Sequence, residues 1–183
     1  MAADTDVILV SMDDTPRGTE EKMRAHRTGA LHRAFSVFLV SGDGRMLLQQ
    51  RAVGKYHSGG LWTNACCSHP RPDVSLQESV HDRMRAELGA DFPVKEQFSF
   101  VYRTVYAPNL IEYEYDHVFL GTASTATVFH PDPEEIAALR WVEIGPLKED
   151  MVRHPEHYTS WFFTAAEGIF RRLNSSFYER SKS

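Results

Sequence analysis

Two long runs of strand-forming residues, Phe98–Tyr106 and Ile111–Thr122, flank a Pro-Asn turn at residues 108–109. Apolar and aromatic runs around a short turn predict a β-hairpin. The runs Arg33–Val40 and Arg45–Gln50 surround the turn "SGDG" in the same way. Shorter strands are predicted at Val7–Met12 and Ala138–Ile144. The chain is therefore expected to be built around a sheet.

Helices are predicted by their caps and by four-residue spacing. Ser75 and Glu78 have the spacing of a capping box, and Gly89 suits a C-terminal cap. Between them, the apolar stripe consists of Leu76, Val80, Met84 and Leu88. We also expect a short helix over 19–26, capped by Thr19, and a long one over 157–173. Strands with a central and a C-terminal helix predict an α+β fold, an α/β/α sandwich on a mixed sheet.

The size and composition favour one soluble domain. The 183 residues are 42% hydrophobic and 25% charged, which suits a single folded domain over 1–183 with a short flexible N-terminus and a polar tail over 174–183. The net charge of −5 disfavours a nucleic-acid partner. Because no apolar run approaches a membrane span and no signal peptide is evident, we expect a cytoplasmic protein without a membrane partner. We also expect a monomer.

The segment "LWTNACCSHP" holds both cysteines, Cys66 and Cys67, next to each other. Adjacent cysteines rarely bond to each other, and two are too few for an all-thiolate zinc site. A redox pair, half of a metal site and one reactive thiol are the three possibilities. Strand-like alternation points Cys67 and His69 to one side and Cys66, a packing residue, to the other.

The strand "LIEYEYDHVFL" carries an alternation with two interpretations. Glu112, Glu114 and Asp116 share a face with Val118, and an aromatic face lies opposite. Because glutamate is rarely buried without a partner, the strand alone favours a solvated acidic face. If the acids instead face inward, they need a metal or a shared proton.

Other candidates are weaker when each is taken alone. Glu87 lies at the edge of the helical stripe, where it can pair with Arg83 or face a cation. Imidazoles and carboxylates together suit Zn, Mn or Fe, and carboxylate and phosphate oxygens suit Mg. Basic side chains near Gly59 and Gly60 could bind a diphosphate or could form an ordinary charged surface.

Four motifs coincide in one family. The segments "WTNACCSHP", "IEYEYD", "AHRTGALHRAFSVFL" and "RAELG" closely resemble type I isopentenyl-diphosphate Δ-isomerases, over about residues 6–173. The helix "QESVHDRMRAELG" resembles a Nudix box in which Ala86 replaces one of two glutamates. The resemblance implies a Nudix-like fold and isoprenoid biosynthesis. The implied reaction interconverts isopentenyl and dimethylallyl diphosphate through a tertiary carbocation.

The resemblance also implies roles for individual residues. Cys67 and Glu114 match the catalytic acid/base pair, and Tyr102 matches a tyrosine that assists Glu114. The expected metal ligands are His26, His32, His69, Glu112 and Glu114 for one Zn²⁺ or Mn²⁺, and Glu87 for a Mg²⁺ on the diphosphate. The expected substrate-binding residues are Lys22, Arg51, Lys55, Arg83 and Trp161, the last facing the carbocation. No flavin is expected, and the partner is a small allylic or homoallylic diphosphate.

Two alternatives belong to other functional classes. A Nudix-type diphosphate hydrolase needs clustered helix carboxylates around Mg²⁺, and Ala86 removes one of them. A zinc-stabilised binding domain would have a closed tetrahedral site. Release of phosphate would indicate the hydrolase, and tolerance of Cys67→Ser would indicate the binding domain.

Overall fold

The fold is a curled mixed sheet with helices on both faces. The structure, a computed structural model, describes residues 6–180, with side chains described for 6–174. Its strands are β1 (Asp6–Val10), β2 (Pro16–Glu21), β3 (His32–Val40), β4 (Arg45–Arg51), β5 (Trp62–Thr63), β6 (Cys66–Ser68), β7 (Val94–Ala107), β8 (Leu110–Thr122) and β9 (Ile136–Glu143). Its helices are α1 (Lys22–Thr28), α2 (Leu76–Leu88), α3 (Ile144–Arg153) and α4 (Ser160–Arg180), with a 3₁₀ turn at Pro155–His157.

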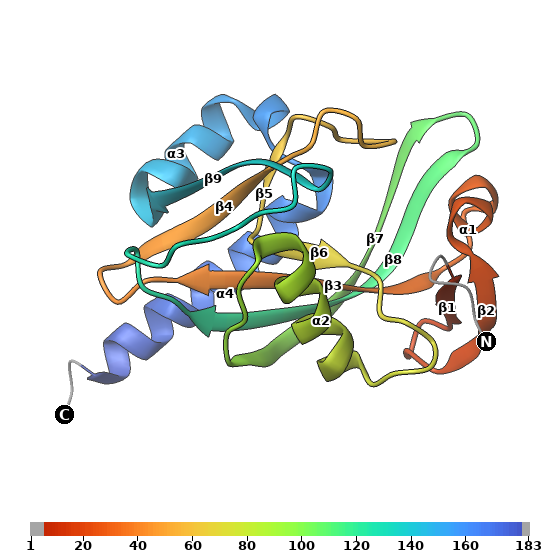
Figure 1. The fold of residues 1–183 in the computed structure, drawn as a ribbon, viewed down its shortest axis with the longest axis horizontal. Helices are drawn as coiled ribbons and strands as arrows, with labels where there is room; N and C mark the ends of the chain where they lie inside the picture. Colours follow the sequence, from red (N-terminus) through yellow and green to blue (C-terminus); the bar gives the residue numbers. More distant parts are fainter. Residues whose placement is uncertain (1–5, 181–183) are drawn as a thin grey trace.

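Strand β3 is the centre of the sheet (Figure 1). It pairs with β8 in parallel and with β6 antiparallel, so β6 and β8 both lie beside it. The long β7–β8 hairpin is antiparallel, and β9 pairs with β4. One parallel pair among antiparallel ones makes the sheet mixed, as the sequence predicts.

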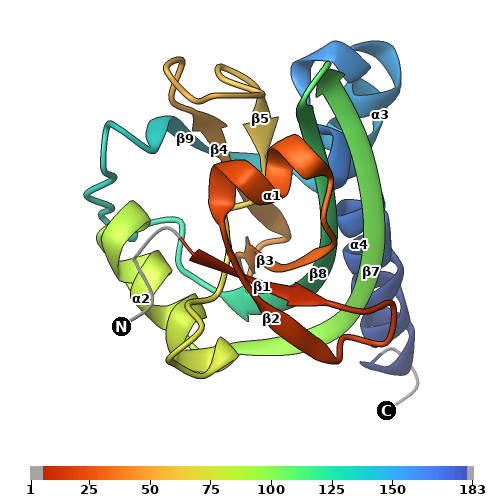
Figure 2. The same cartoon turned by 90° about the vertical axis from the view of Figure 1, so that its right-hand side faces the viewer.

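Helix α2 lies on one side of the sheet and α3 and α4 on the other (Figure 2), and each side has its own hydrophobic cluster. On one face, Val80, Met84 and Leu88 of α2 pack with Phe35 and Leu39 of β3. On the other face, α3 and α4 cover the sheet, and Phe162 stacks on Phe38 at 6.0 Å between ring centroids. The α+β sandwich predicted from the sequence is confirmed.

The predicted elements are largely confirmed, with differences at their ends. Helix α2 has the predicted capping box at Ser75 and a left-handed cap at Gly89. The helix expected from residue 19 begins at Lys22, because residues 16–21 pair with β1 as β2 and Thr19 lies opposite Ile8. The Glu21 side chain, which accepts hydrogen bonds from two backbone N–H groups, caps α1 instead.

Other short elements have weak sequence signals. Strands β2, β5 and β6 and helix α3 are not in the prediction, and α4 begins at Ser160 because residues 155–157 form a 3₁₀ turn. The expected tail over 174–183 overlaps the end of α4, and the last three residues and the first five lie outside the described part. Within residues 6–180, no helix combines the length and apolar character that crossing a bilayer requires.

Candidate active site

Three neighbouring strands bring the motif residues to one face of the sheet. Cys67 on β6 lies opposite Ser36 of β3, and His32 of β3 lies opposite Glu114 of β8. Strands are about 4.8 Å apart, so Cys67 and Glu114 are on strands roughly 10 Å from each other. The Ser36 hydroxyl spans part of this gap and donates to Asp116 at 2.8 Å. Cys67 and Glu114 therefore line one cavity from its two sides.

The acidic face of β8 points inward. Glu112, Glu114 and Asp116 are all at most 5% exposed. The interpretation favoured by the strand alone, a solvated acidic face, is therefore wrong. Imidazole and hydroxyl groups contact all three carboxylates and offset the free-energy cost of burying them.

Four of the five expected Zn²⁺ or Mn²⁺ ligands form one cluster. Ligand atoms of His26, His32, His69 and Glu114 all lie within 4.8 Å of one another. His69 Nε2 is 2.8 Å from Glu114 Oε1 and 3.2 Å from His32 Nε2. Backbone carbonyls fix the orientation of two of the rings. Nδ1 of His26 is bonded to the carbonyl of Lys22, and Nδ1 of His32 is bonded to the carbonyl of Ala30. Each of these rings therefore has its other nitrogen, Nε2, available for the cluster, where Nε2 of His32 meets His69 and Nε2 of His26 also lies 3.4 Å from the Tyr56 hydroxyl.

The pKa values in the cluster suit metal ligation. Burial lowers the pKa of His26 to about 4 and that of His69 to about 3, so both imidazoles are neutral at pH 7. Burial would raise the pKa of Glu114, but the His69 and His32 side chains outweigh it and lower the pKa well below its usual range. The pKa of His32 moves the other way. Burial would lower it, but the hydrogen bond to Glu114 and the charge of that carboxylate outweigh burial and raise it, so a bound cation would displace any proton on this ring. Two neutral imidazoles, a third that the cation would deprotonate and an ionised carboxylate form a donor set that Zn²⁺ and Mn²⁺ accept. The residues present therefore fit such an ion.

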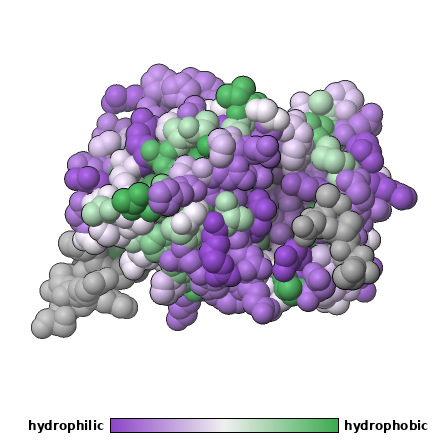
Figure 3. All heavy atoms as spheres, in the orientation of Figure 1, coloured by the Kyte–Doolittle hydropathy of each residue, from purple (hydrophilic) through white to green (hydrophobic). Residues whose placement is uncertain are grey.

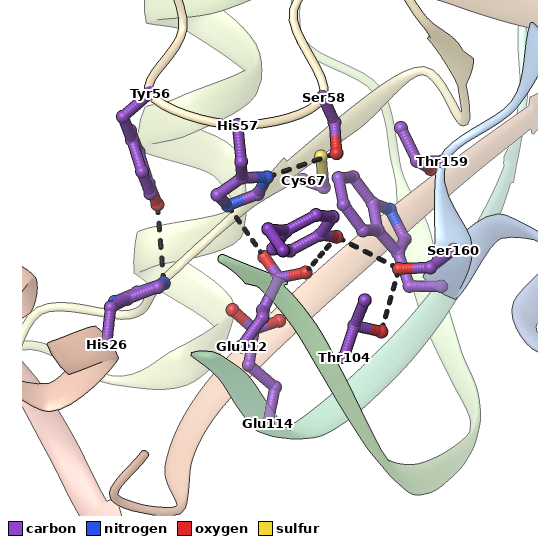
Figure 4. A network of polar contacts seen from close by, with 12 residues as sticks. His26, Tyr56, His57, Ser58, Cys67, Thr104, Glu112, Glu114, Thr159 and Ser160 are labelled. Carbon is purple, nitrogen blue, oxygen red and sulfur yellow. Dashed lines mark hydrogen bonds and ion pairs between the residues drawn. The ribbon is translucent and has the colours of Figure 1, made fainter. Parts of the chain in front are cut away.

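The fifth expected ligand, Glu112, belongs to a second group. It shares His26 with the first cluster but is grouped with His57, not with His32 and His69. Its Oε1 lies 3.1 Å from His57 Nε2, and its Oε2 accepts a 2.9 Å hydrogen bond from Tyr106 (Figure 4). Burial raises the pKa of Glu112, and the nearby Glu114 charge raises it further.

Tyr102 is bonded to the expected catalytic glutamate. Its hydroxyl donates to Glu114 Oε2 at 2.5 Å, because Tyr102 of β7 lies opposite Glu114 of β8 in the hairpin. Burial raises the pKa of Tyr102 well above its usual range, with the Glu112 and Glu114 charges adding to this effect. The phenol therefore stays protonated and serves Glu114 as a donor.

Cys67 is half-buried and faces the cavity, whereas Cys66 is fully buried. Burial raises the pKa of Cys67 to about 12, although the Arg51 guanidinium opposes the shift. Arg51 Nη1 lies 3.9 Å from its sulfur. Cys67 is therefore a protonated thiol at neutral pH.

Cys66 and Glu87 meet beneath the cavity. The Cys66 thiol donates to Glu87 Oε2 at 3.5 Å, so Cys66 is more than the packing residue that alternation suggests. Arg83 binds the other oxygen of Glu87 through two N–H groups, at 3.0 and 2.5 Å. Glu87 is 2% exposed and lines the cavity, so it faces inward and is not an edge residue.

All four expected basic residues line this cavity. Lys22, Arg51, Lys55 and Arg83 converge from α1, β4, the loop after β4 and α2. Lys55 pairs with Glu135, and Arg83 lies 3.5 Å from the same carboxylate. Burial lowers the pKa of Lys22.

Trp161 forms the aromatic wall of the cavity. It is 3% exposed, and its Nε1 donates to Asn64 Oδ1 at 3.3 Å. The guanidinium of Arg51 lies 5.2 Å from its ring centroid. The residue therefore both packs in the core at the start of α4 and presents a surface to the site.

Several residues in or next to the cavity have no role in the sequence prediction, among them Tyr56, His57, Glu135 and Asp116, the last as the partner of Ser36. His57 and Glu135 belong to loops, where no periodicity indicates the direction of a side chain. Asp116 shares the alternating face of Glu114, a signal that could have placed it in the site. Burial and the Glu114 charge raise the pKa of Asp116 well above its usual range.

The cavity is small and continues into a larger hollow. Its volume is about 70 Å³, and an adjoining hollow of about 680 Å³ shares Lys22, His69, Arg83 and Glu135 with it. Figure 3 shows a hydrophilic hollow between the body of the molecule and the end that carries β1, β2 and α1. This shape suits a ligand with a small reactive end and a larger anionic end.

Comparisons with known proteins identify the family. The NUDIX domain profile matches residues 30–162. An isopentenyl-diphosphate Delta-isomerase 2 of Aromatoleum aromaticum is 45% identical over 172 residues, 93% of this chain and 90% of that protein. An isopentenyl-diphosphate Delta-isomerase of Burkholderia multivorans is 45% identical over 161 residues, 88% of this chain and 90% of that protein.

Solved structures agree on the fold. A Deinococcus radiodurans protein superimposes with a TM-score of 0.66 at 15% identity, covering 81% of this chain and 89% of that one. A MutT protein from Methanosarcina mazei superimposes with a TM-score of 0.61 at 18% identity, covering 79% of this chain and 95% of that one. At such identities the likeness concerns the fold alone. From the sequence relatives and the matched domain, the chain belongs to the isopentenyl-diphosphate Delta-isomerase family of enzymes, on a Nudix fold.

Proposed function

We propose that this protein catalyses the reversible isomerisation of isopentenyl diphosphate to dimethylallyl diphosphate. The observation that carries the proposal is the pairing, in one cavity, of a protonated Cys67 thiol with the Tyr102–Glu114 pair. Moving a double bond by one carbon needs one group that gives a proton and another that removes one. Groups on strands either side of β3 can reach two faces of a five-carbon unit.

The chain's own residues supply the acid/base chemistry. An unactivated alkene is a weak base, so its protonation needs a donor held close and shielded from water. With Cys67 protonated and Glu114 ionised, Cys67 is the group that can give the first proton and Glu114, assisted by Tyr102, is the group that can remove one. The reverse reaction runs the same transfers backwards, from Glu114 to the substrate and from the substrate to Cys67. Trp161 faces the positive charge that develops on the tertiary carbon, and an aromatic face stabilises a cation by about 0.5–2 kcal/mol.

Metal ions complete the proposed site. His26, His32, His69 and Glu114, joined by Glu112, would hold one Zn²⁺ or Mn²⁺. When bound, this ion would fix the orientation of Glu114 and stabilise its ionised form. Glu87 would hold a Mg²⁺ that neutralises the diphosphate, once Arg83 turns from Glu87 toward the phosphate oxygens.

The diphosphate is expected among the basic residues. Lys22, Arg51, Lys55 and Arg83 all line the cavity, and Lys22 and Arg83 also line the larger hollow. Because Lys55 and Arg83 pair with Glu135 and Glu87 here, substrate binding exchanges these partners for phosphate oxygens. The cytoplasmic location and the monomeric state stay predictions.

The test is direct conversion. Purified protein is incubated with isopentenyl diphosphate, Mg²⁺ and Mn²⁺, and dimethylallyl diphosphate is measured by ¹H NMR while ³¹P NMR follows the diphosphate. We expect conversion to an equilibrium mixture with the diphosphate intact. No conversion by metal-loaded protein, or release of phosphate in place of isomerisation, would overturn the proposal.

A further inference from the structure

His57 is a buried imidazole beside the predicted metal site and has no role in the reaction described above. It lies in the loop between β4 and β5, and its side chain is 2% exposed. Its ring stacks on Tyr106 at 4.5 Å between centroids and an interplanar angle of 8°. The ring is therefore held in one plane by packing, with its nitrogen edge toward Glu112.

The orientation of His57 follows from its two nitrogens. Nδ1 lies 3.2 Å from Ser58 Oγ, and the hydroxyl can donate to it. The ring then carries its hydrogen on Nε2, which lies 3.1 Å from Glu112 Oε1. Within the described part of the chain no polar atom is aligned with Nε2 as a hydrogen-bond partner, so its N–H meets Glu112 Oε1 as a bent polar contact and not as a linear hydrogen bond.

The second oxygen of Glu112 is also fixed. Tyr106 donates to Oε2 at 2.9 Å, and its own oxygen lies 3.0 Å from Ser160 Oγ, which in turn accepts from Thr104 (Figure 4). Glu112 is thus held between the loop that carries His57 and the start of α4. A buried carboxylate with a partner on each oxygen has little freedom to turn.

The position of Glu112 decides whether a fifth ligand reaches the ion. The four-residue cluster excludes Glu112, but His26 belongs to both groups and links them. We propose that His57 is a positioning residue for the metal site, an inference that rests on the proposed function. Its imidazole holds Glu112 beside His26, at the edge of the cluster, from which the carboxylate completes the coordination of the cation.

The same loop would connect the metal with the diphosphate. Lys55, two residues before His57, pairs with Glu135. The hydroxyl oxygen of Tyr56 lies 3.4 Å from His26 Nε2. A displacement of this loop by an incoming diphosphate therefore moves His57 relative to Glu112. The loop therefore touches the proposed metal site at two points, through His57 on Glu112 and through Tyr56 on His26.

The experiment measures Mn²⁺ binding to chelator-treated protein by isothermal titration calorimetry, without substrate. His57→Phe keeps the ring that stacks on Tyr106 but removes both nitrogens. We expect its Kd for Mn²⁺ to rise about 10- to 100-fold, the usual cost of losing an outer-shell partner of a metal ligand. His57→Gln restores an N–H donor and is expected to recover most of the affinity, and His130→Ala, which removes an exposed imidazole, to leave it unchanged.

A double-mutant cycle tests whether His57 acts through Glu112. In a Glu112→Gln background, His57→Phe should cause no further loss, whereas an undiminished loss would overturn the proposal. A His57→Phe affinity equal to that of the His130→Ala control would overturn it as well. Wild-type protein that binds no Mn²⁺ would overturn this inference together with the metal part of the proposed function. Normal Mn²⁺ affinities without conversion of substrate would overturn the isomerase proposal alone.

Discussion

At the residue scale, substitution of Cys67 tests the proposed acid/base pair most directly. We expect Cys67→Ala to lower turnover about 10²- to 10⁴-fold, the usual contribution of a positioned proton carrier. The change removes one half-buried sulfur, so circular dichroism and the free energy of unfolding should stay close to wild type. Cys66→Ala is the matched comparison, because it removes the neighbouring thiol, which does not line the cavity, and should lower turnover far less than Cys67→Ala since it can act only through Glu87. Retained turnover in Cys67→Ala would remove this residue from the mechanism.

The protonation state of Cys67 can be measured separately from turnover. A pKa of about 12, against an ordinary value of 9.0, leaves about a thousandfold less thiolate at pH 8 than a free cysteine has. Because only the thiolate attacks iodoacetamide, alkylation of Cys67 in a Cys66→Ala background should be slower than that of free cysteine by a similar factor. Mass spectrometry of the modified peptide over pH 7–10 gives the rate. Alkylation as fast as that of free cysteine would contradict the assignment of a neutral thiol.

At the element scale, the cap of α2 should contribute to stability without affecting chemistry. Ser75 accepts from the Glu78 backbone N–H, and the Glu78 side chain accepts from the Ser75 backbone N–H. We expect Ser75→Ala to cost about 1 kcal/mol of unfolding free energy, measured by urea denaturation, with turnover unchanged. Ser75→Thr keeps the hydroxyl and should lower the free energy of unfolding by only a few tenths of a kcal/mol. Equal losses for both variants would show that the cap bond contributes nothing.

The elements show where sequence patterns suffice and where they do not. The capping box and four-residue stripe predict α2 closely, because every signal in it is local. The alternation in β8 defines its two faces, but which face is buried depends on imidazoles from α1, from β3 and from the segment after β6. Thr19 is an acceptable helix cap by itself, yet pairing with β1 takes it into a strand.

At the scale of the whole molecule, the candidate site is assembled from distant segments. His26, His32, His69 and Glu114 come from α1, β3, the segment after β6 and β8, and only the tertiary fold brings their ligand atoms together. Spacing alone could not group them, and the family resemblance supplied the set. The loop residues His57 and Glu135 have no such signal, so the structure alone places them in the site.

Burial of neutral imidazoles also gives the whole fold a pH dependence. The pKa of His69 is about 3 and that of His26 about 4 in the folded protein, both below the ordinary value of 6.5. Above pH 6.5 neither state binds these protons. Below it the unfolded chain binds them and the folded chain does not, so stability is lost as pH falls toward 4. Each histidine contributes a slope of about 1.4 kcal/mol per pH unit within that window.

Urea denaturation of chelator-treated protein between pH 7.5 and 4.5 measures this slope. In His69→Gln the slope should decrease by about 1.4 kcal/mol per pH unit, because one of the linked protons is gone. His130→Ala, which removes an exposed imidazole, should leave the slope unchanged. Bound Mn²⁺ should stabilise the wild type by about 2.7 kcal/mol at a hundredfold excess over Kd, and less at lower pH, because protons compete for the same nitrogens. If the wild type and His69→Gln show equal slopes, His69 is not buried as a neutral imidazole, and the ion would then have to displace a proton from this ring before it could bind.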